Sequence, residues 1–258
     1  MKAGLEIEKL SVGYKRRPLI ADFSAKLKEG TTTALIGRNG AGKTTLIKTL
    51  TRQLNPLKGQ IWLDRRELSS YSRNELSKLM AVVTTEQNMA GGLRLKEFVE
   101  MGRIPFTGRF GRLSEEDREV VEQALKSVDL IHKQESFVSE LSDGERQKGM
   151  LARALVQQTP LIIMDEPFSF LDIATRLEMN VLIRKLAHEN NKTILYSTHE
   201  VGEALRMADE IWILTKNNMV AGPPQKLIDK GHIDQLLADT QVVFDRKTHE
   251  FRIEEKGN

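Results

Sequence analysis

The stretch "GRNGAGKTTLIKTL", from Gly37 to Leu50, places three glycines and a lysine between two apolar segments. The run before it, "TTTALIG" (31–37), is apolar and rich in β-branched residues, which predicts a buried strand. The run after it, "TTLIKTLTRQL", has the apolar spacing of a helix, and "NPLKG" then supplies residues that end helices. We therefore expect a strand, a glycine-rich turn and a helix in direct succession.

The turn matches the pattern G-x-x-x-x-G-K-[ST] at every fixed position. Glycines accept positive φ angles, so successive backbone N–H groups can point at one anion, and the helix that follows adds its positive dipole end. The Lys43 ammonium is suited to the β- and γ-phosphates, and the Thr44 hydroxyl to Mg²⁺. We predict that a nucleoside triphosphate binds residues Gly37, Arg38, Asn39, Gly40, Ala41, Gly42, Lys43, Thr44 and Thr45.

A second acidic element, "LIIMDE" (161–166), has four apolar residues followed by Asp165 and Glu166. In an open α/β sheet, ligands collect at the carboxyl ends of the strands, so both acids should face the phosphate loop. Asp165 is suited to the Mg²⁺ shell. Glu166 is placed to accept a proton from an attacking water, which makes it the candidate general base.

The rest of the chain alternates between strand and helix patterns. "LEIEKLSV" and "DFSAKLKEG" near the N-terminus read as strands with one exposed face, whereas residues from about 88 to 158 read as mainly helical. Strands and helices alternate again after Pro160, which indicates a mostly parallel sheet covered on both faces. No cysteine is present, so disulfides, zinc–thiolate sites and thiol nucleophiles are excluded.

Five further motifs stand in order along the chain. "SVGY" ends in Tyr14, "TTEQ" ends in Gln87, "LSDGERQ" covers Leu141–Gln147, "SFLD" ends in Asp172 and "STHE" contains His199. Together with the two elements above, these motifs resemble those of the ATP-binding-cassette (ABC) ATPases over nearly the whole chain.

The resemblance implies an α/β P-loop NTPase fold with a mostly parallel core sheet, an N-terminal antiparallel β subdomain and an inserted α-helical subdomain. The expected divisions are a RecA-like core of about residues 1–87 and 159–225, a helical subdomain of about 88–158 and a short C-terminal tail, 226–258.

The resemblance also implies roles for single residues, with ATP and Mg²⁺ as cofactors. Tyr14 would stack on adenine, Gln87 would contact Mg²⁺, and His199 would donate to the γ-phosphate. The implied catalytic residues are Glu166, His199, Gln87 and Lys43, and the implied metal ligands are Thr44, Gln87 and Asp165.

The signature segment implies a partner of the same kind. Ser142 and Glu145 form the S-x-x-E pattern of a capped helix start. In the family this helix start faces the ATP of the opposite subunit, so the resemblance implies a head-to-tail homodimer in which Ser142, Gly144, Glu145 and Asp172 adjoin the nucleotide. Asp143 and Glu145 depart from the common L-S-G-G-Q, and two acids near a triphosphate should repel it unless they point away.

The longest apolar runs are far shorter than a membrane span, so separate permease subunits are expected. The segment "MGRIPFTGRFGRLSEEDREVVEQAL" resembles importers for iron chelates, haem and cobalamin, although Phe106 stands where many carry histidine. The expectation is an ATPase at the cytoplasmic face of the membrane that powers import with a permease and a substrate-binding protein. Residues from Ala90 to Met101 would receive a permease helix, with Met89, Leu93, Leu95 and Phe98 as candidate exposed apolar residues.

Four alternatives are weighed against this expectation. An exporter ATPase of the same family is one. A non-transport cassette factor acting on ribosomes usually carries two cassettes in tandem, whereas one is present here. An ABC-type ATPase acting on nucleic acid would carry a long coiled coil between Lys43 and Ser142, but these lie 142 − 43 = 99 positions apart without sustained heptads. A regulatory GTPase would need Asn-Lys-x-Asp, whereas "NKTI" ends in Ile194. The formal net charge of +3, without a basic stripe, predicts no nucleic-acid partner.

Overall fold

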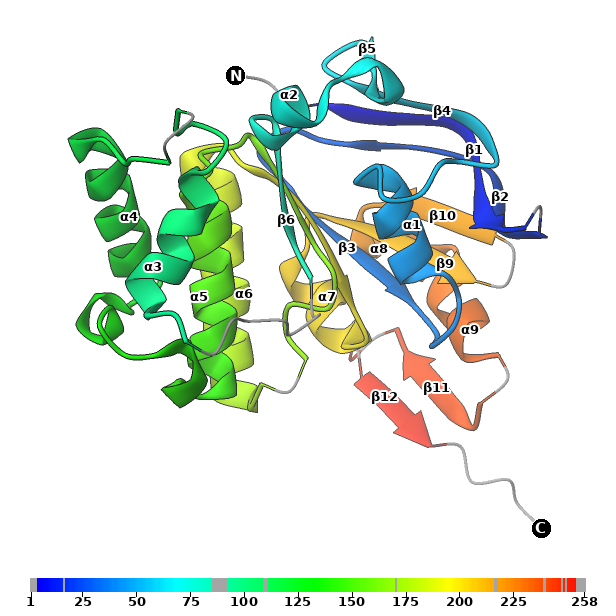
Figure 1. Ribbon diagram of the computed structural model, residues 1–258. Helices are drawn as coiled ribbons and strands as arrows, with labels where there is room; N and C mark the ends of the chain where they lie inside the picture. The colour runs from blue at the N-terminus through cyan, green and yellow to red at the C-terminus, as the bar shows by residue number, and fades with distance from the viewer. Residues whose placement is uncertain are drawn as a thin grey trace.

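The computed structural model describes residues 4–15, 17–84, 92–108, 111–169, 171–215, 218–238, 240–246, 248 and 250–253. Its N-terminal part contains an antiparallel sheet with the strand order β2-β1-β4-β5, seen at the upper right of Figure 1. The strands are β1 (Leu5–Tyr14), β2 (Arg17–Leu27), β4 (Lys58–Leu63) and β5 (Arg66–Glu67). The expected N-terminal antiparallel unit is confirmed, although β2 begins five residues before Asp22, where the sequence pattern started it.

A second sheet has the order β10-β9-β3-β8-β7-β6 and runs through the middle of the molecule (Figure 1). All neighbours in it are parallel except β9 and β10, which confirms the mostly parallel core sheet. Its strands are β3 (Thr32–Gly37), β6 (Met80–Val83), β7 (Leu161–Met164), β8 (Thr193–Thr198), β9 (Glu210–Thr215) and β10 (Asn218–Gly222).

Helices cover both sheets. Those in the described residues are α1 (Lys43–Leu50), α2 (Arg73–Ser77), α3 (Leu95–Glu100), α4 (Glu115–Ser127), α5 (Asp143–Leu155), α6 (Ile173–Asn190), α7 (Val201–Met207), α8 (Pro224–Asp229) and α9 (His232–Leu237). Short 3₁₀ turns cover Leu68–Ser70, Met101–Arg103, Ile131–Lys133 and Val138–Glu140, and the chain ends in a hairpin of β11 (Val242–Asp245) and β12 (Glu250–Ile253). Between β6 and β7 the described residues form helices, turns and one isolated bridge, Arg94 with Phe137.

Two apolar cores lie on the opposite faces of the parallel sheet. Leu35 of β3 belongs to the core shared with α1 and the antiparallel sheet, whereas its neighbours Ala34 and Ile36 belong to the core shared with α5 and α6. This alternation follows from the period of two along a strand. All six residues of β3 are buried, which explains why the run before the glycine turn is continuously apolar or β-branched.

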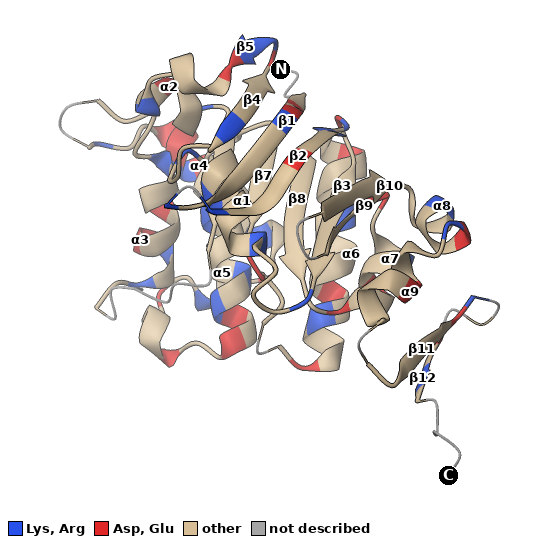
Figure 2. Cartoon of the chain, turned by 90° about the vertical axis from the view of Figure 1, so that its right-hand side faces the viewer, with Lys and Arg blue, Asp and Glu red and all other residues tan. Residues whose placement is uncertain are grey.

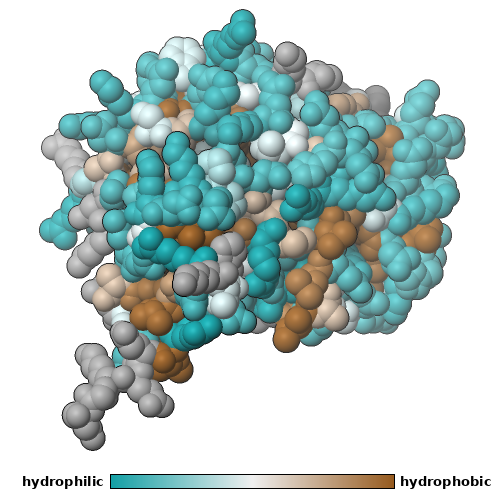
Figure 3. Space-filling view, turned by 180° about the vertical axis from the view of Figure 1, so that it is seen from behind, coloured by the Kyte–Doolittle hydropathy of each residue, from teal (hydrophilic) through white to brown (hydrophobic). Residues whose placement is uncertain are grey.

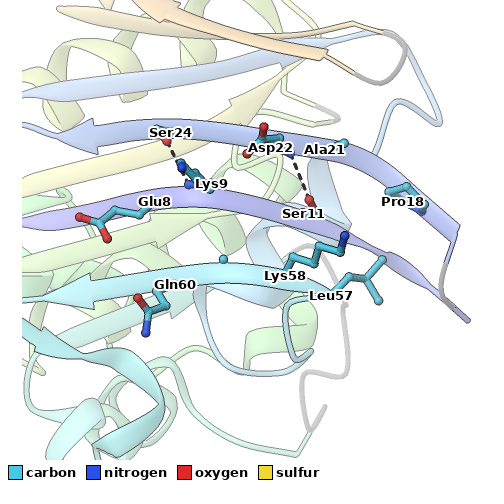
Figure 4. Close-up of a pocket in the computed structure, with 11 residues that line it drawn as sticks. Glu8, Lys9, Ser11, Pro18, Ala21, Asp22, Ser24, Leu57, Lys58 and Gln60 are labelled. Carbon is cyan, nitrogen blue, oxygen red and sulfur yellow. Dashed lines mark hydrogen bonds between the residues drawn. The ribbon is translucent and has the colours of Figure 1, made fainter.

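A hollow of about 1100 Å³ lies on the antiparallel sheet (Figure 4). It forms where β1, β2 and β4 depart from regular pairing, with positive φ at Lys9 and Asp22. Serine hydroxyls replace the lost ladder bonds, since the backbone N–H of Lys9 donates to Ser24 Oγ at 3.0 Å and that of Asp22 to Ser11 Oγ at 3.1 Å (Figure 4). The hollow is therefore a consequence of the bulges.

The surface is mixed in charge. On the face seen in Figure 2, basic and acidic residues are interspersed, and no basic stripe is visible. On the face seen in Figure 3, hydrophobic residues gather in a few strips on a mostly hydrophilic surface. The exposed large hydrophobic residues include Ile173, Leu177 and Val181, which follow one another at four-residue spacing along α6. Of the helices in the described ranges, none combines the length and the apolar character needed to cross a bilayer.

A buried ion pair joins three parts of the helical region. The Arg103 guanidinium donates to Asp117 Oδ1 from Nε at 2.7 Å, and to the carbonyl oxygen of Val156, just after α5, at 2.7 Å. Both side chains are about nine-tenths buried. Asp117 in turn accepts from the backbone of Ser114, and this bond, with Arg103, holds the pKa of its carboxyl below its usual range. The turn at 101–103 is thereby fixed to α4 and α5.

Gly102 allows this turn to approach α5 closely. A methyl group at Gly102 would lie 2.3 Å from the carbonyl oxygen of Arg153 and 2.3 Å from Val156 Cγ2. The carbonyl oxygen is part of the backbone and can move only if the end of α5 shifts. Glycine is therefore required at this position by packing.

Gly102→Ala should lower the free energy of unfolding by about 1–3 kcal/mol, because no space remains for a methyl group between the turn at 101–103 and the end of α5. Urea denaturation followed by circular dichroism measures the effect. Gly108→Ala is the matched control, since a methyl group there meets nothing within 4 Å. Equal stability of the two variants would contradict the packing argument.

Candidate nucleotide site

The phosphate loop has the backbone that its glycines predict. Gly40 and Gly42 adopt φ angles of 76° and 108°, a region that other residues rarely enter, and α1 begins directly after Gly42. Gly37 lies against β9, where a methyl group would come within 2.7 Å of the Leu214 carbonyl oxygen. The first N–H groups of α1 therefore open at the carboxyl edge of the parallel sheet, an arrangement that suits an anion.

Lys43 of α1 is the first of three connected polar side chains, and the other two, His199 and Glu166, follow β8 and β7. Its ammonium donates to the Gly37 carbonyl at 2.9 Å and lies 3.3 Å from Nδ1 of His199. Since an ammonium only donates, Nδ1 accepts and Nε2 carries the ring proton, which points at Glu166 Oε1 at 2.5 Å. Burial lowers the pKa of Lys43, against the opposing effect of the Glu166 and Asp165 carboxylates.

Ser197 connects the two acids at the end of β7, and the sequence analysis did not identify it. Its hydroxyl donates to Asp165 Oδ1 at 2.7 Å and accepts from the backbone N–H of Glu166 at 2.8 Å. Ser197 is fully buried, and Glu166 has a positive φ of 49°, unusual for a glutamate. The one available signal was the position of Ser197 at the end of an apolar strand, two residues before His199.

Two hollows open beside these groups. One, of about 310 Å³, is lined by Glu166, Phe168, Ser169, Arg176, Ser197, Thr198, His199 and Glu200. The other, of about 570 Å³, lies along the phosphate loop and is lined by Arg38, Asn39, Gly40, Ala41, Leu214, Thr215, Gln235 and Leu236. The site thus combines an open loop of N–H donors and a lysine with carboxylates at one sheet edge.

Tyr14, at the end of β1, is about half exposed, and its hydroxyl lies 3.4 Å from the Thr45 hydroxyl on α1. An exposed aromatic ring therefore adjoins the helix of the phosphate loop. Thr44 is exposed as well, whereas Thr45 is buried and packs α1 against its surroundings. Gln87, the remaining predicted residue, lies outside the described residues.

The signature residues form the start of α5. Ser142 Oγ accepts from the Glu145 N–H at 3.2 Å while Glu145 Oε2 accepts from the Ser142 N–H at 2.9 Å, so the predicted capping box is confirmed. Gly144 packs on the start of α6, where a methyl group would lie 2.9 Å from Thr175 Cγ2. Asp172 caps α6 by accepting from the Thr175 N–H at 3.0 Å. The signature and the "SFLD" segment are therefore neighbours within one chain.

The signature and the phosphate loop belong to different parts of the molecule. Figure 1 has α5 in the helical part on the left and α1 on the right, with the parallel sheet between them. The Ser142 hydroxyl accepts from the Glu145 N–H, and the Ser142 N–H donates to the Glu145 carboxylate. Within this chain, the side chains connected to one another beside the phosphate loop are Lys43, His199 and Glu166.

Comparison with known proteins identifies the family. The family described as ABC transporter matches residues 20–169. An uncharacterized ABC transporter ATP-binding protein of Methanocaldococcus jannaschii is 37% identical over 90% of this chain and 80% of its own. The iron(3+)-hydroxamate import ATP-binding protein of Bacillus subtilis is 32% identical over 95% of this chain and 92% of its own.

A solved structure agrees with these relatives. An inward-facing transporter assigned to the metal-chelate type of ABC transporter superposes with a TM-score of 0.81 at 26% identity, covering 98% of this chain and 96% of the other. The phosphate loop, the paired acids, the signature turn and these similarities lead to one conclusion: the chain belongs to the ATP-binding proteins of the ABC transporter family.

Proposed function

We propose that this protein is the ATP-hydrolysing subunit of an importer for a ferric siderophore or a related metal chelate. It would act at the cytoplasmic face of the membrane, bound to separate permease subunits that work with a substrate-binding protein. The observation that carries the proposal is the convergence of Lys43, His199 and Glu166 beside the phosphate loop. The substrate class rests on the relative whose name specifies iron(3+)-hydroxamate import and on the metal-chelate transporter.

ATP would lie along the phosphate loop, with its adenine on the exposed ring of Tyr14 and its phosphates at the N–H groups that open α1. The donor set fits Mg²⁺, which usually keeps waters and substrate phosphates and takes only one or two protein oxygens. Thr44 and Asp165 would supply these, together with the predicted Gln87, and no larger group of acidic, histidine or cysteine side chains is arranged for a metal among the described residues. Held by these residues, Mg²⁺ would supply positive charge against the negative charge of the phosphates.

Glu166 would act as the general base on the attacking water. His199 Nε2 donates to one carboxylate oxygen at 2.5 Å and Ser169 Oγ to the other at 3.3 Å, so the carboxylate is oriented from both sides. Ser197 holds the backbone of Glu166, which makes it a positioning residue. Lys43 would face the γ-phosphate and stabilise its developing charge, and His199 would do so when its Nε2–H turns from Glu166 to a phosphate oxygen.

Two copies would close head to tail over two ATP molecules. Ser142, Gly144 and Glu145 of one copy would cover the nucleotide that the other copy holds at its phosphate loop, with Asp172 beside them. The Ser142 hydroxyl accepts a bond in its capping box but keeps its proton for a phosphate oxygen. The division into a core (1–87 and 159–225), a helical subdomain (88–158) and a tail (226–258) belongs to the same proposal, since the core would carry the phosphate loop and the helical subdomain the signature.

The permease would dock in a groove of about 270 Å³ between β6, the turn at 101–103 and α5. Met101 and Ile104, which line it, are 40% and 61% exposed. Two of the apolar residues expected on this surface, Leu95 and Phe98, instead lie in the core at 0% and 4% exposure, because they form the inner face of α3. Leu93 is partly buried, and Met89 lies outside the described residues.

Glu166→Gln should bind ATP but hydrolyse it at least about 100-fold more slowly, because an amide cannot take the proton from water. The ATP-bound variant should accumulate as a dimer in size-exclusion chromatography with light scattering. Adding Lys43→Ala provides the control, since loss of ATP binding should leave the double variant monomeric. Wild-type turnover in Glu166→Gln would exclude Glu166 as the base.

Ser197→Ala should lower kcat about tenfold, because Glu166 loses the partner of its backbone N–H and its carboxylate shifts. The free energy of unfolding should fall by about 1–3 kcal/mol, since buried polar groups lose their partner. Steady-state ATPase assays and urea denaturation measure the two effects. Ser169→Ala, which removes only the long 3.3 Å bond to the carboxylate, should have a smaller effect on both.

Ile104→Asp should abolish transport while the ATPase activity of the isolated subunit stays unchanged, because a carboxylate in the groove opposes an apolar partner. The assay is uptake of radiolabelled ferric hydroxamate by proteoliposomes that contain the co-purifying permease and its binding protein. Ile253→Asp, at a site 74% exposed in β12, is the control. Full uptake by Ile104→Asp would refute the docking site. If the wild-type transporter takes up a different solute but no ferric hydroxamate, the proposed substrate class is refuted.

A further inference from the structure

Two acids stand at the turn that the proposed function brings to a partner's triphosphate. Asp143 and Glu145 are both in the first turn of α5. The N-terminus of a helix attracts anions, but fixed carboxylates beside it repel them. The turn therefore needs a local source of positive charge if it is to close on ATP.

Glu145 has two partners that account for its charge. One of its oxygens accepts from the Ser142 N–H, and the other lies 3.4 Å from the Lys133 ammonium, which comes from the 3₁₀ turn Ile131–Lys133. The bond from Ser142, with further help from Lys133, keeps the pKa of Glu145 below its usual value, so the carboxyl is ionised at neutral pH. Lys133 is the basic side chain that faces it.

Asp143 is paired in a different way. The Arg146 guanidinium, one helical turn further on, forms an ion pair with the Asp143 carboxylate. The same guanidinium donates from Nη1 to the Leu141 carbonyl oxygen at 2.6 Å. Arg146 is 28% exposed, against 52% for Asp143, so the arginine is anchored across the start of the helix while the aspartate is more open to solvent.

We propose that Lys133 and Arg146 are positioning residues for ATP hydrolysis, which neutralise Glu145 and Asp143 so that the signature turn accepts the γ-phosphate held by a second copy. The inference rests on the proposed head-to-tail dimer. Each acid is paired with its own basic side chain: Lys133 comes from the 3₁₀ turn before the signature, and Arg146 comes from α5 itself. The pairing thus turns a sequence departure that should repel ATP into a turn of nearly neutral charge.

The test uses Lys133→Gln and Arg146→Gln in the full-length protein. Each should raise the KM for ATP in hydrolysis by about twofold to fivefold with kcat little changed, because closure weakens by the value of one exposed ion pair. The affinity of the isolated subunit for a fluorescent ATP analogue should not change, since the phosphate loop is intact. In the Glu166→Gln background, dimerisation should require correspondingly more ATP.

The decisive measurement is rescue by removal of the acid. Glu145→Gln should restore the KM of Lys133→Gln, and Asp143→Asn should restore that of Arg146→Gln, whereas the crossed combinations should not. Lys126→Gln and Arg118→Gln are the matched controls, because they break an i,i+4 and an i,i+3 ion pair on α4, away from the signature. Both should behave as wild type.

The outcomes separate this inference from the proposed function. If the wild-type protein hydrolyses ATP and Glu166→Gln dimerises, yet Lys133→Gln and Arg146→Gln keep a wild-type KM, only the neutralising role is overturned. The neutralising role is also overturned if Lys133→Gln and Arg146→Gln both raise the KM but removal of the paired acid restores the KM of neither variant. If the wild-type protein fails to hydrolyse ATP and Glu166→Gln fails to dimerise, the proposed function falls and this inference with it.

Discussion

The parallel register of β3, β8 and β7 is the constraint on which the site depends. Ile36 lies opposite Thr198, and Met164 opposite Tyr196, so the three strands end within a residue or two of one another. The segments that follow these three strands must therefore meet at one edge of the sheet. The phosphate loop, the two acids and the histidine segment follow them. For that reason Lys43 and His199, 156 positions apart in sequence, share a hydrogen bond.

The sequence was sufficient to predict this edge because its signals are local. Each signal can be recognised from a few consecutive residues. These signals are the glycine spacing, the four apolar residues before Asp165 and Glu166, and the strand before His199. Ser197 escaped notice because its importance lies in the two partners it holds, and a serine that closes a strand has no pattern of its own. The burial of Leu95 and Phe98 could not be predicted for the same reason. It depends on which face of α3 packs against α5, and the sequence of a six-residue helix does not specify that face.

The two acids of the signature turn, which depart from the common signature sequence, are paired with basic and polar groups around them. Read alone, Asp143 and Glu145 make the start of α5 acidic. In the fold, one carboxylate is taken up by the capping box and by Lys133, and the other by Arg146. The sequence could foresee the cap, since Ser142 and Glu145 are three residues apart, but the contact of Lys133 depends on a chain reversal between α4 and α5 that no short pattern specifies.

The buried bond between Arg103 and the end of α5 has a mechanical consequence. Ile104, exposed in the groove, follows Arg103 directly. Arg103 is bonded to the residue that caps the C-terminus of α5, and Ser142 caps the N-terminus of the same helix. Thirteen residues of α-helix span about 20 Å. If a permease bound in the groove displaced Ile104 and Arg103, α5 would carry that displacement as a rigid body to the Ser142 hydroxyl at its opposite end.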